Sequence, residues 1–353
     1  MIRPRPRFAL LAIAAALASG APLAAEDAPP PAPSPNEIVA GAEPAEWVAI
    51  APADLLLMTL APDAKGKPRE VVIQLMPPPF SQGWVDNIRK LAAAHWYDGL
   101  AITRVQDNYV VQWGDPNYDN PEAEGEAKPL PEGLRVIEEN MYVVPRESQE
   151  GSDLNRAHRQ FRINFAEALS AYPDNIRYDP VHNRNELEGR HNADNYAQLA
   201  SFSDGWPFAG DPSGFWPVHC YGMVGVGRGM SPDTGSGAEL YTVIGHAPRH
   251  LDRNIALVGR VVEGIEHLSS LPRGTGDLGF YETPEERTPI VSIRLASELP
   301  GAEQPQFQYL STESETFARY ADARTNRRDP FFIVPAGGAD ICNIPVPVRR
   351  VGG

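Results

Sequence analysis

The chain is short of cysteine, of long apolar runs and of positive charge, and each shortage excludes a class of protein. Only two of its 353 residues are cysteines, Cys220 and Cys342. Two cysteines cannot complete a zinc site alone, and no histidines and cysteines cluster at ligand spacing, so we expect no metal. Beyond the N-terminal segment no apolar run approaches the roughly 18 residues of a membrane span, so we expect the mature chain to have none.

Acidic residues outnumber basic ones by 46 to 31, which gives a formal net charge of −15 at pH 7. The lysines and arginines form no cluster that would act as a basic patch. Attraction to phosphates dominates non-specific binding to nucleic acids, so an acidic chain of this kind is expected to have no nucleic-acid partner.

Residues 1–25 are typical of a secretory signal peptide. Arg3, Arg5 and Arg7 form a basic start, residues 8–17 form an apolar stretch, and small residues then lead to the cleavage site. The apolar stretch is too short to cross a bilayer, and an uncleaved membrane anchor is the alternative interpretation. We therefore expect an exported, periplasmic protein.

Export places the two cysteines in an oxidising compartment. A disulfide between Cys220 and Cys342 is then the expected state, and two buried free thiols are the alternative. The bond would tie the C-terminal end of the chain to its core.

The remaining chain divides by composition. Residues 26–45 are rich in proline and alanine and are expected to be a disordered linker. Residues 46–298 form the main domain, and residues 299–353 form a C-terminal extension with a predicted helix and an extended, proline-rich edge. Apolar runs bounded by turn residues predict strands at about 46–60, 71–75, 100–105, 109–112, 221–226, 239–244 and 290–295.

Helical spacing of apolar residues predicts a helix over 84–94, with Ser81 as its N-cap, and a short helix over 263–270. A further amphipathic helix is predicted over 152–172, inside a long stretch of about 117–218 that is otherwise acidic, aromatic and turn-rich. A loop of that length is improbable within a compact domain. We expect a partly helical insertion packed on one side of the core.

One segment carries the spacing of an active site. Residues 103–115 read Thr-Arg-Val-Gln-Asp-Asn-Tyr-Val-Val-Gln-Trp-Gly-Asp. The stretch resembles the cyclophilin family of peptidyl-prolyl isomerases, in which it reads His-Arg-Val/Ile-x-x-x-Phe-x-x-Gln-Gly-Gly-Asp. Arg104, Tyr109 and Gln112 take the places of the arginine, the aromatic residue and the glutamine, and Val110 takes an apolar place beside them.

A second set of segments resembles the far wall of the same pocket. Residues 237–241 read Gly-Ala-Glu-Leu-Tyr, where the family has Gly-Ser-Gln-Phe-Phe. Residues 250–252 read His-Leu-Asp, where the family has an aromatic residue or histidine followed by Leu-Asp. Residues 223–225 read Met-Val-Gly in place of Met-Ala-Asn, whose backbone pairs with the substrate.

The resemblance implies how each residue would act. Rotation about an Xaa-Pro bond is slow because it breaks the conjugation of the imide nitrogen, at a barrier of about 18–20 kcal/mol. A catalyst needs a donor to that nitrogen and an apolar slot for the proline ring, but no metal or other cofactor. Arg104 would be the donor and Gln112 would hold it in place. The slot would be formed by Tyr109, Val110, Tyr241 and Leu251.

The rim departs from the family pattern. Val224, Gly225, Glu239 and His250 would contact substrate, yet Gly225 and Glu239 stand where the family has asparagine and glutamine. These changes remove substrate hydrogen bonds and leave the donor and the slot. The alternative interpretations give these residues no functional role: a surface salt bridge for Arg104, ordinary core for the slot residues, and a rim histidine with no proton-transfer role for His250.

We therefore predict a mainly β, closed, antiparallel eight-stranded barrel of the cyclophilin type, capped by two helices. The expected function is peptidyl-prolyl isomerisation that assists the folding of exported proteins, with proline-containing segments as partners. One alternative is a binding module or chaperone for such segments with little turnover. A second makes the insertion the functional part, docking on an envelope partner.

Overall fold

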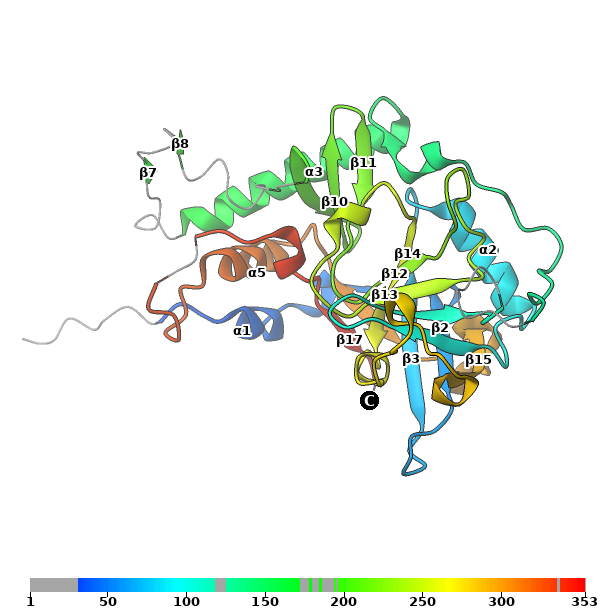
Figure 1. Cartoon of the computed structure of the whole chain (residues 1–353). Helices are drawn as coiled ribbons and strands as arrows, with labels where there is room; N and C mark the ends of the chain where they lie inside the picture. The colour runs from blue at the N-terminus through cyan, green and yellow to red at the C-terminus, as the bar shows by residue number, and fades with distance from the viewer. Residues whose placement is uncertain are drawn as a thin grey trace, which may run out of the picture.

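The strands predicted from apolar runs form seven of the eight strands of one antiparallel barrel, and the eighth, over residues 257–263, was not predicted (Figure 1). The computed structural model describes residues 31–117, 125–171, 178–179, 184–185, 194, 196–334 and 337–352. The predicted signal peptide lies outside these residues. The predicted eight-stranded barrel is confirmed, with its strands in the order β12 (Met223–Val226), β13 (Leu240–Val243), β5 (Val110–Gly114), β4 (Ala101–Val105), β15 (Thr288–Leu295), β2 (Leu55–Leu60), β3 (Arg69–Leu75) and β14 (Leu257–Glu263).

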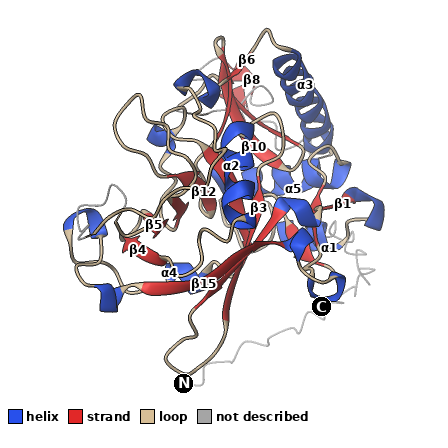
Figure 2. Cartoon of the chain, turned by 90° about the vertical axis from the view of Figure 1, so that its right-hand side faces the viewer, coloured by secondary structure: helices blue, strands red, loops and turns tan. Residues whose placement is uncertain are grey.

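The two predicted barrel helices are present. Helix α2 (Gln82–Ala93) packs against β14 and β15, and the single turn α4 (Glu266–Ser269) packs against β3 (Figure 2). Ser81 is the N-cap residue of α2, as predicted, but its backbone is left-handed and its side chain makes no capping bond. Burial of the apolar face stabilises α2 instead, because Trp84, Ile88 and Leu91 are fully enclosed.

The barrel register lines up the candidate active-site residues across three neighbouring strands. Arg104 on β4 pairs with Gln112 on β5, and Gln112 pairs in turn with Tyr241 on β13. Val110 lies opposite Val243 in the same pair of strands. Residues directly opposite each other in a sheet present their side chains to the same face, so this register brings Arg104, Gln112 and Tyr241 to one surface.

The insertion contains a sheet as well as the predicted helix. Helix α3 (Gln149–Ser170) buries Leu154, Phe161, Phe165 and Leu169. The aromatic, turn-rich stretch after it forms strands, which the sequence analysis missed. They make a four-stranded antiparallel sheet in the order β6 (Val144–Pro145), β11 (Gly214–Pro217), β10 (Trp206–Asp211) and β9 (Leu199–Ser203), and a short pair consists of β7 (Tyr178–Asp179) and β8 (Arg184–Asn185).

The C-terminal extension packs on the insertion, and the N-terminal helix packs on the extension. Helix α5 (Glu315–Asn326) lies between α3 and a short helix, α1 (Pro35–Ala40), and the three lie to one side of the barrel (Figure 1). Helix α1 begins with a capping box at Ser34, so the expectation of disorder throughout 26–45 is wrong for this part. A further sheet joins β1 (Trp47–Ala49) to β16 (Phe307–Leu310) and the edge strand β17 (Val348–Arg350).

One apolar core extends from the barrel into the insertion and the C-terminal extension. Phe317 of α5 meets Phe202 of β9 and Phe161 of α3, with ring centroids 5.0 and 6.2 Å away. Such aromatic packing excludes water from the contact between the elements and stabilises it. Within the described part of the chain, no helix has the length and apolar character of a membrane span.

Candidate active site

A cavity of about 260 Å³ opens where β4, β5 and β13 present the aligned residues. Six of the ten predicted catalytic and substrate-contacting residues line it: Arg104, Tyr109, Val110, Gln112, Tyr241 and Leu251. The structure adds five residues that the sequence analysis did not assign to the site: Gly227, Arg228, Ile255, Leu278 and Phe280.

The Arg104 guanidinium is held by neutral acceptors on three sides. Its Nε donates to the carbonyl oxygen of Leu278 at 2.7 Å, and its Nη1 donates to Oε1 of Gln112 at 3.3 Å. Its Nη2 donates to Oε1 of Gln106. Partial burial lowers the pKa of Arg104, but an arginine stays charged at neutral pH. The side chain therefore presents a fixed positive charge to the cavity.

Two aromatic rings flank this charge. The Cζ atom of Arg104 lies 5.7 Å from the centroid of Tyr109 and 5.4 Å from the centroid of Phe280. Contacts of this kind favour a cation over the faces of the rings. Phe280 belongs to a turn that follows Gly279, and its backbone bridges to Arg104 itself. The sequence analysis missed it because the turn lies far along the chain from β4 and has no recognised motif.

Glu239 is not on the rim, which corrects the predicted substrate contact. Its side chain is buried, and its Oε1 accepts from the backbone N–H of Asp115 at 2.6 Å. Its Oε2 lies 3.5 Å from Nε2 of Gln112. A Cβ atom on Gly114 would fall 2.0 Å from the Glu239 carboxylate, so this inward position depends on glycine there. Glu239 thus supports Gln112 from behind.

The apolar slot is a small cluster of its own. Val110, Tyr241 and Val243 are buried together, and the partly exposed Tyr109 and Ile255 pack against them. This arrangement leaves apolar surface facing the cavity beside the Arg104 charge. The site therefore combines a fixed cation with a slot in which a ring of modest size can be enclosed.

Besides Glu239, three predicted contact residues lie outside the cavity lining. Val224 and Gly225 are buried in the barrel wall, and a Cβ atom at position 225 would fall 2.4 Å from the Tyr241 ring. The absence of a side chain there lets the ring of Tyr241 lie across β12. His250 is exposed on the rim, where it stacks on Tyr109 with centroids 6.5 Å apart.

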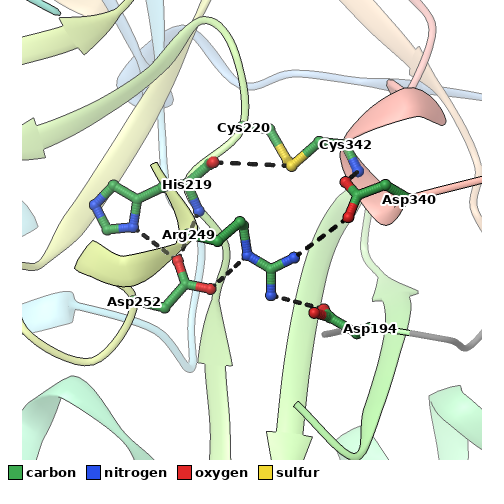
Figure 3. Close-up of a disulfide and its surroundings, with 7 residues drawn as sticks. All are labelled: Asp194, His219, Cys220, Arg249, Asp252, Asp340 and Cys342. Atoms are coloured by element: carbon green, nitrogen blue, oxygen red, sulfur yellow. Dashed lines mark hydrogen bonds and ion pairs between the residues drawn. A yellow bond between two sulfur atoms is a disulfide. The ribbon is translucent and has the colours of Figure 1, made fainter. Parts of the chain in front are cut away.

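A chain of buried polar groups runs behind the slot, and Figure 3 shows its part from His219 through Asp252 to Arg249. The hydroxyl of Tyr241 lies 2.8 Å from Nε2 of His219, and Nδ1 of His219 lies 2.9 Å from Oδ1 of Asp252. Asp252 also accepts from Nε of Arg249 at 2.6 Å. Burial lowers the pKa of His219, so the ring is neutral at pH 7. Because a carboxylate only accepts, Nδ1 donates to Asp252 and Nε2 accepts from Tyr241.

The insertion and the C-terminal extension both reach this network. Nη2 of Arg249 lies 2.7 Å from Asp194 of the insertion, and its Nη1 lies 4.0 Å from Asp340 of the extension. Beside them a disulfide joins Cys220 to Cys342, with an S–S distance of 2.00 Å (Figure 3). The wall of the slot is thus braced by parts of the chain outside the barrel.

In the described part of the chain, no group of three or more histidine, cysteine, aspartate or glutamate side chains is placed to hold a metal. The Arg104 cation, the Gln112 side chain and the apolar slot can act on a neutral ring and its amide bond without a metal. This arrangement offers hydrogen-bond donation and apolar enclosure, and no side chain in the cavity is an activated nucleophile.

Comparison with known proteins finds a family model and solved structures that are similar to this chain. The model of the family described as "Cyclophilin type peptidyl-prolyl cis-trans isomerase/CLD" matches residues 83–295. The crystal structure of cyclophilin AquaCyp293 from Hirschia baltica is similar with a TM-score of 0.55 and 20% identity, over 86% of this chain and 93% of that one. A cyclophilin-type isomerase from Cryptosporidium parvum gives a TM-score of 0.34 and 11% identity, over 69% of this chain and 96% of that one. No curated protein sequence matches.

Proposed function

Because this chain belongs to the family of cyclophilin-type peptidyl-prolyl cis-trans isomerases, we propose that Arg104 and the cavity beside it form its active site. The reaction is the interconversion of cis and trans Xaa-Pro bonds. The observation that carries the proposal is the position of the Arg104 charge at one side of a cavity whose other side is the apolar cluster of Val110 and Tyr241.

Arg104 would stabilise the twisted bond. When the bond to proline rotates, conjugation is lost and the lone pair of the nitrogen becomes a hydrogen-bond acceptor. A guanidinium N–H that donates to this lone pair stabilises the transition state more than either planar ground state. Gln112 accepts from Arg104 and fixes the direction of the fork, which avoids a cost of reorganisation during the rotation.

The slot would hold the ring while the carbonyl side of the bond rotates. Tyr109, Val110, Tyr241 and Leu251 provide the apolar surface, and Ile255 and Phe280 extend it. A ring enclosed in this way loses water and is held in place, so that the remaining freedom is rotation about the bond itself. Proline-containing segments of other polypeptides are therefore the proposed substrates.

We propose exported proteins as the clients. The support is the basic and then apolar pattern of residues 1–17, together with the disulfide between Cys220 and Cys342. Both features fit a location in the periplasm, where the isomerase would act on chains that fold after export.

A binding module with little turnover is the second candidate, and one contact favours it. The Nε atom of Arg104 already donates to the Leu278 carbonyl, so one of its donors is engaged within the protein. A module of this kind would retain the slot and bind proline-containing segments while it accelerates their isomerisation only weakly.

The deciding experiment measures isomerisation of a short Xaa-Pro peptide by the mature protein and by Arg104→Ala. We expect the variant to lose at least about tenfold in kcat/KM, as is typical when a donor to a transition state is removed. Arg273→Ala is the matched control, since Arg273 is an exposed arginine that pairs with Asp107. Turnover that is equal in wild type and Arg104→Ala would sink the proposed role, and binding without any turnover would favour the binding module.

A further inference from the structure

Arg228 is a second cation on the same cavity. It follows the end of β12 after Gly227 and lines the cavity with Gly227 and Ile255, whereas Arg104 lies beside Leu278 and Phe280. Its Nε donates to the carbonyl oxygen of Asn254 at 2.9 Å, and its Nη1 donates to the carbonyl oxygen of Gly229 at 2.7 Å. Two bonds to backbone carbonyls hold the guanidinium in one place and leave its charge uncompensated.

No carboxylate neutralises either arginine. Across the described residues, neither Arg104 nor Arg228 has an acidic oxygen within 4.0 Å, and the cavity lining contains no aspartate or glutamate. Asp233 belongs to the same loop as Arg228, but its two oxygens accept from the backbone N–H groups of Gly229 and Gly235 at 2.7 and 2.9 Å. The cavity is therefore lined by two cations and no carboxylate, in a chain whose net charge is −15.

The position of Arg228 suits a group beside the proline. Burial raises the pKa of the hydroxyls of Tyr241 and Tyr142, and the nearby charge of Arg228 opposes this rise at both. Its third nitrogen, Nη2, has no hydrogen-bond partner among the described residues and is not buried. A guanidinium held by its Nε and Nη1 can still donate from Nη2 to an incoming oxygen.

We propose that Arg228 selects substrates in which a carboxylate side chain flanks the proline. The inference rests on the proposed function, because it assumes that the proline ring occupies the slot. Aspartate or glutamate next to the proline would accept from Nη2, and this charge-assisted bond adds to the enclosure of the ring. A lysine at the same position would be disfavoured by both arginines.

The test compares peptides that carry Glu, Gln or Lys directly before or directly after the proline and are otherwise identical. Turnover and binding are both measured, at low ionic strength, for wild type and for Arg228→Gln. In wild type we expect one position to favour Glu over Gln by about three- to tenfold, as one partly exposed charged contact allows. In Arg228→Gln this ratio should fall to about one, and in Arg228→Glu the preference should turn to Lys.

Arg135→Gln is the control, because Arg135 is an exposed arginine that pairs with Asp86 outside the cavity. Its Glu-to-Gln ratio should equal that of wild type. A wild-type ratio near one at every position, or a ratio that survives in Arg228→Gln, would overturn the inference. A charge preference in binding without turnover would support Arg228 as the selector and at the same time overturn the proposed enzymatic role of Arg104.

Discussion

Glu239 lies directly behind Gln112, with Oε2 of the carboxylate 3.5 Å from Nε2 of the amide. The other end of the same amide, Oε1, accepts from Arg104. A carboxylate accepts and does not donate, so it favours the orientation in which the amide nitrogen faces inward and the amide oxygen faces Arg104. Glu239 is thus a positioning residue for Gln112 and, through Gln112, for Arg104.

This relationship predicts the effect of Glu239→Ala. The backbone N–H of Asp115 would lose its acceptor inside the barrel, and we expect unfolding to become easier by about 1–3 kcal/mol. Gln112 would also lose its support, and kcat/KM on an Xaa-Pro peptide should fall about three- to tenfold. Glu239→Gln keeps an acceptor for Asp115 and serves as the control with a smaller loss of stability. If Glu239→Ala kept the turnover of wild type, Arg104 would not depend on the contacts that join it through Gln112 to Glu239.

Removal of the Tyr241 hydroxyl is expected to lower the stability of the fold and to leave peptide turnover almost unchanged. Burial raises its pKa well above the usual 10, so the group stays protonated and donates to His219. In Tyr241→Phe the buried Nε2 of His219 loses its partner, at a cost of about 1–3 kcal/mol in denaturant unfolding. The ring stays in the slot, so peptide turnover should stay within about twofold of wild type. Tyr241→Ala removes the ring, and an equal turnover in both variants would contradict the slot.

His158 on α3 predicts a loss of stability in mild acid. Burial, with Arg162, Arg146 and Arg159 nearby, lowers its pKa from 6.5 to about 4. Between these values the unfolded chain binds a proton that the folded chain does not, so the free energy of unfolding falls as the pH drops below 6.5. The imidazole stays partly hydrated, which limits the effect to about 1 kcal/mol.

The measurement is the free energy of unfolding at several pH values for wild type and His158→Asn. The variant should show a shallower fall between pH 6.5 and about 4. His219, whose pKa burial also lowers, contributes a fall of the same sign in both proteins. If the free energy of unfolding of His158→Asn fell with pH as steeply as that of wild type, the assignment of this loss of stability to His158 would be refuted.

The disulfide predicts a redox-dependent stability. It closes a loop with a sequence separation of 122 residues, for which loop entropy gives about 4–5 kcal/mol in the simplest model. We expect a reductant to lower the urea midpoint of wild type and to leave the double variant Cys220→Ser, Cys342→Ser unaffected. Equal midpoints for oxidised wild type and the double variant would mean that the bond adds nothing to stability.

Local pattern was sufficient for most of the barrel and for one half of the site. Apolar runs predicted the strands, and the spacing of Arg104 and Gln112 is that of opposite residues in one hairpin. The local sequence pattern was insufficient to predict the sheet of β9, β10 and β11. Their residues are buried on both faces, so the alternation that identifies a half-exposed strand is absent. The glycines among them indicate turns when the sequence is taken alone.

Family and fold were therefore determined by the sequence itself, because the motif around Arg104 and the apolar runs are local features that any stable packing must satisfy. Only the tertiary structure decided which residues complete the cavity. Leu278 meets Arg104 across 174 residues of chain, and Arg228 reaches the cavity from the loop after β12. Glu239 faces inward because glycine at 114 leaves room for it. Contacts of this kind depend on the packing of distant segments, which no local pattern encodes.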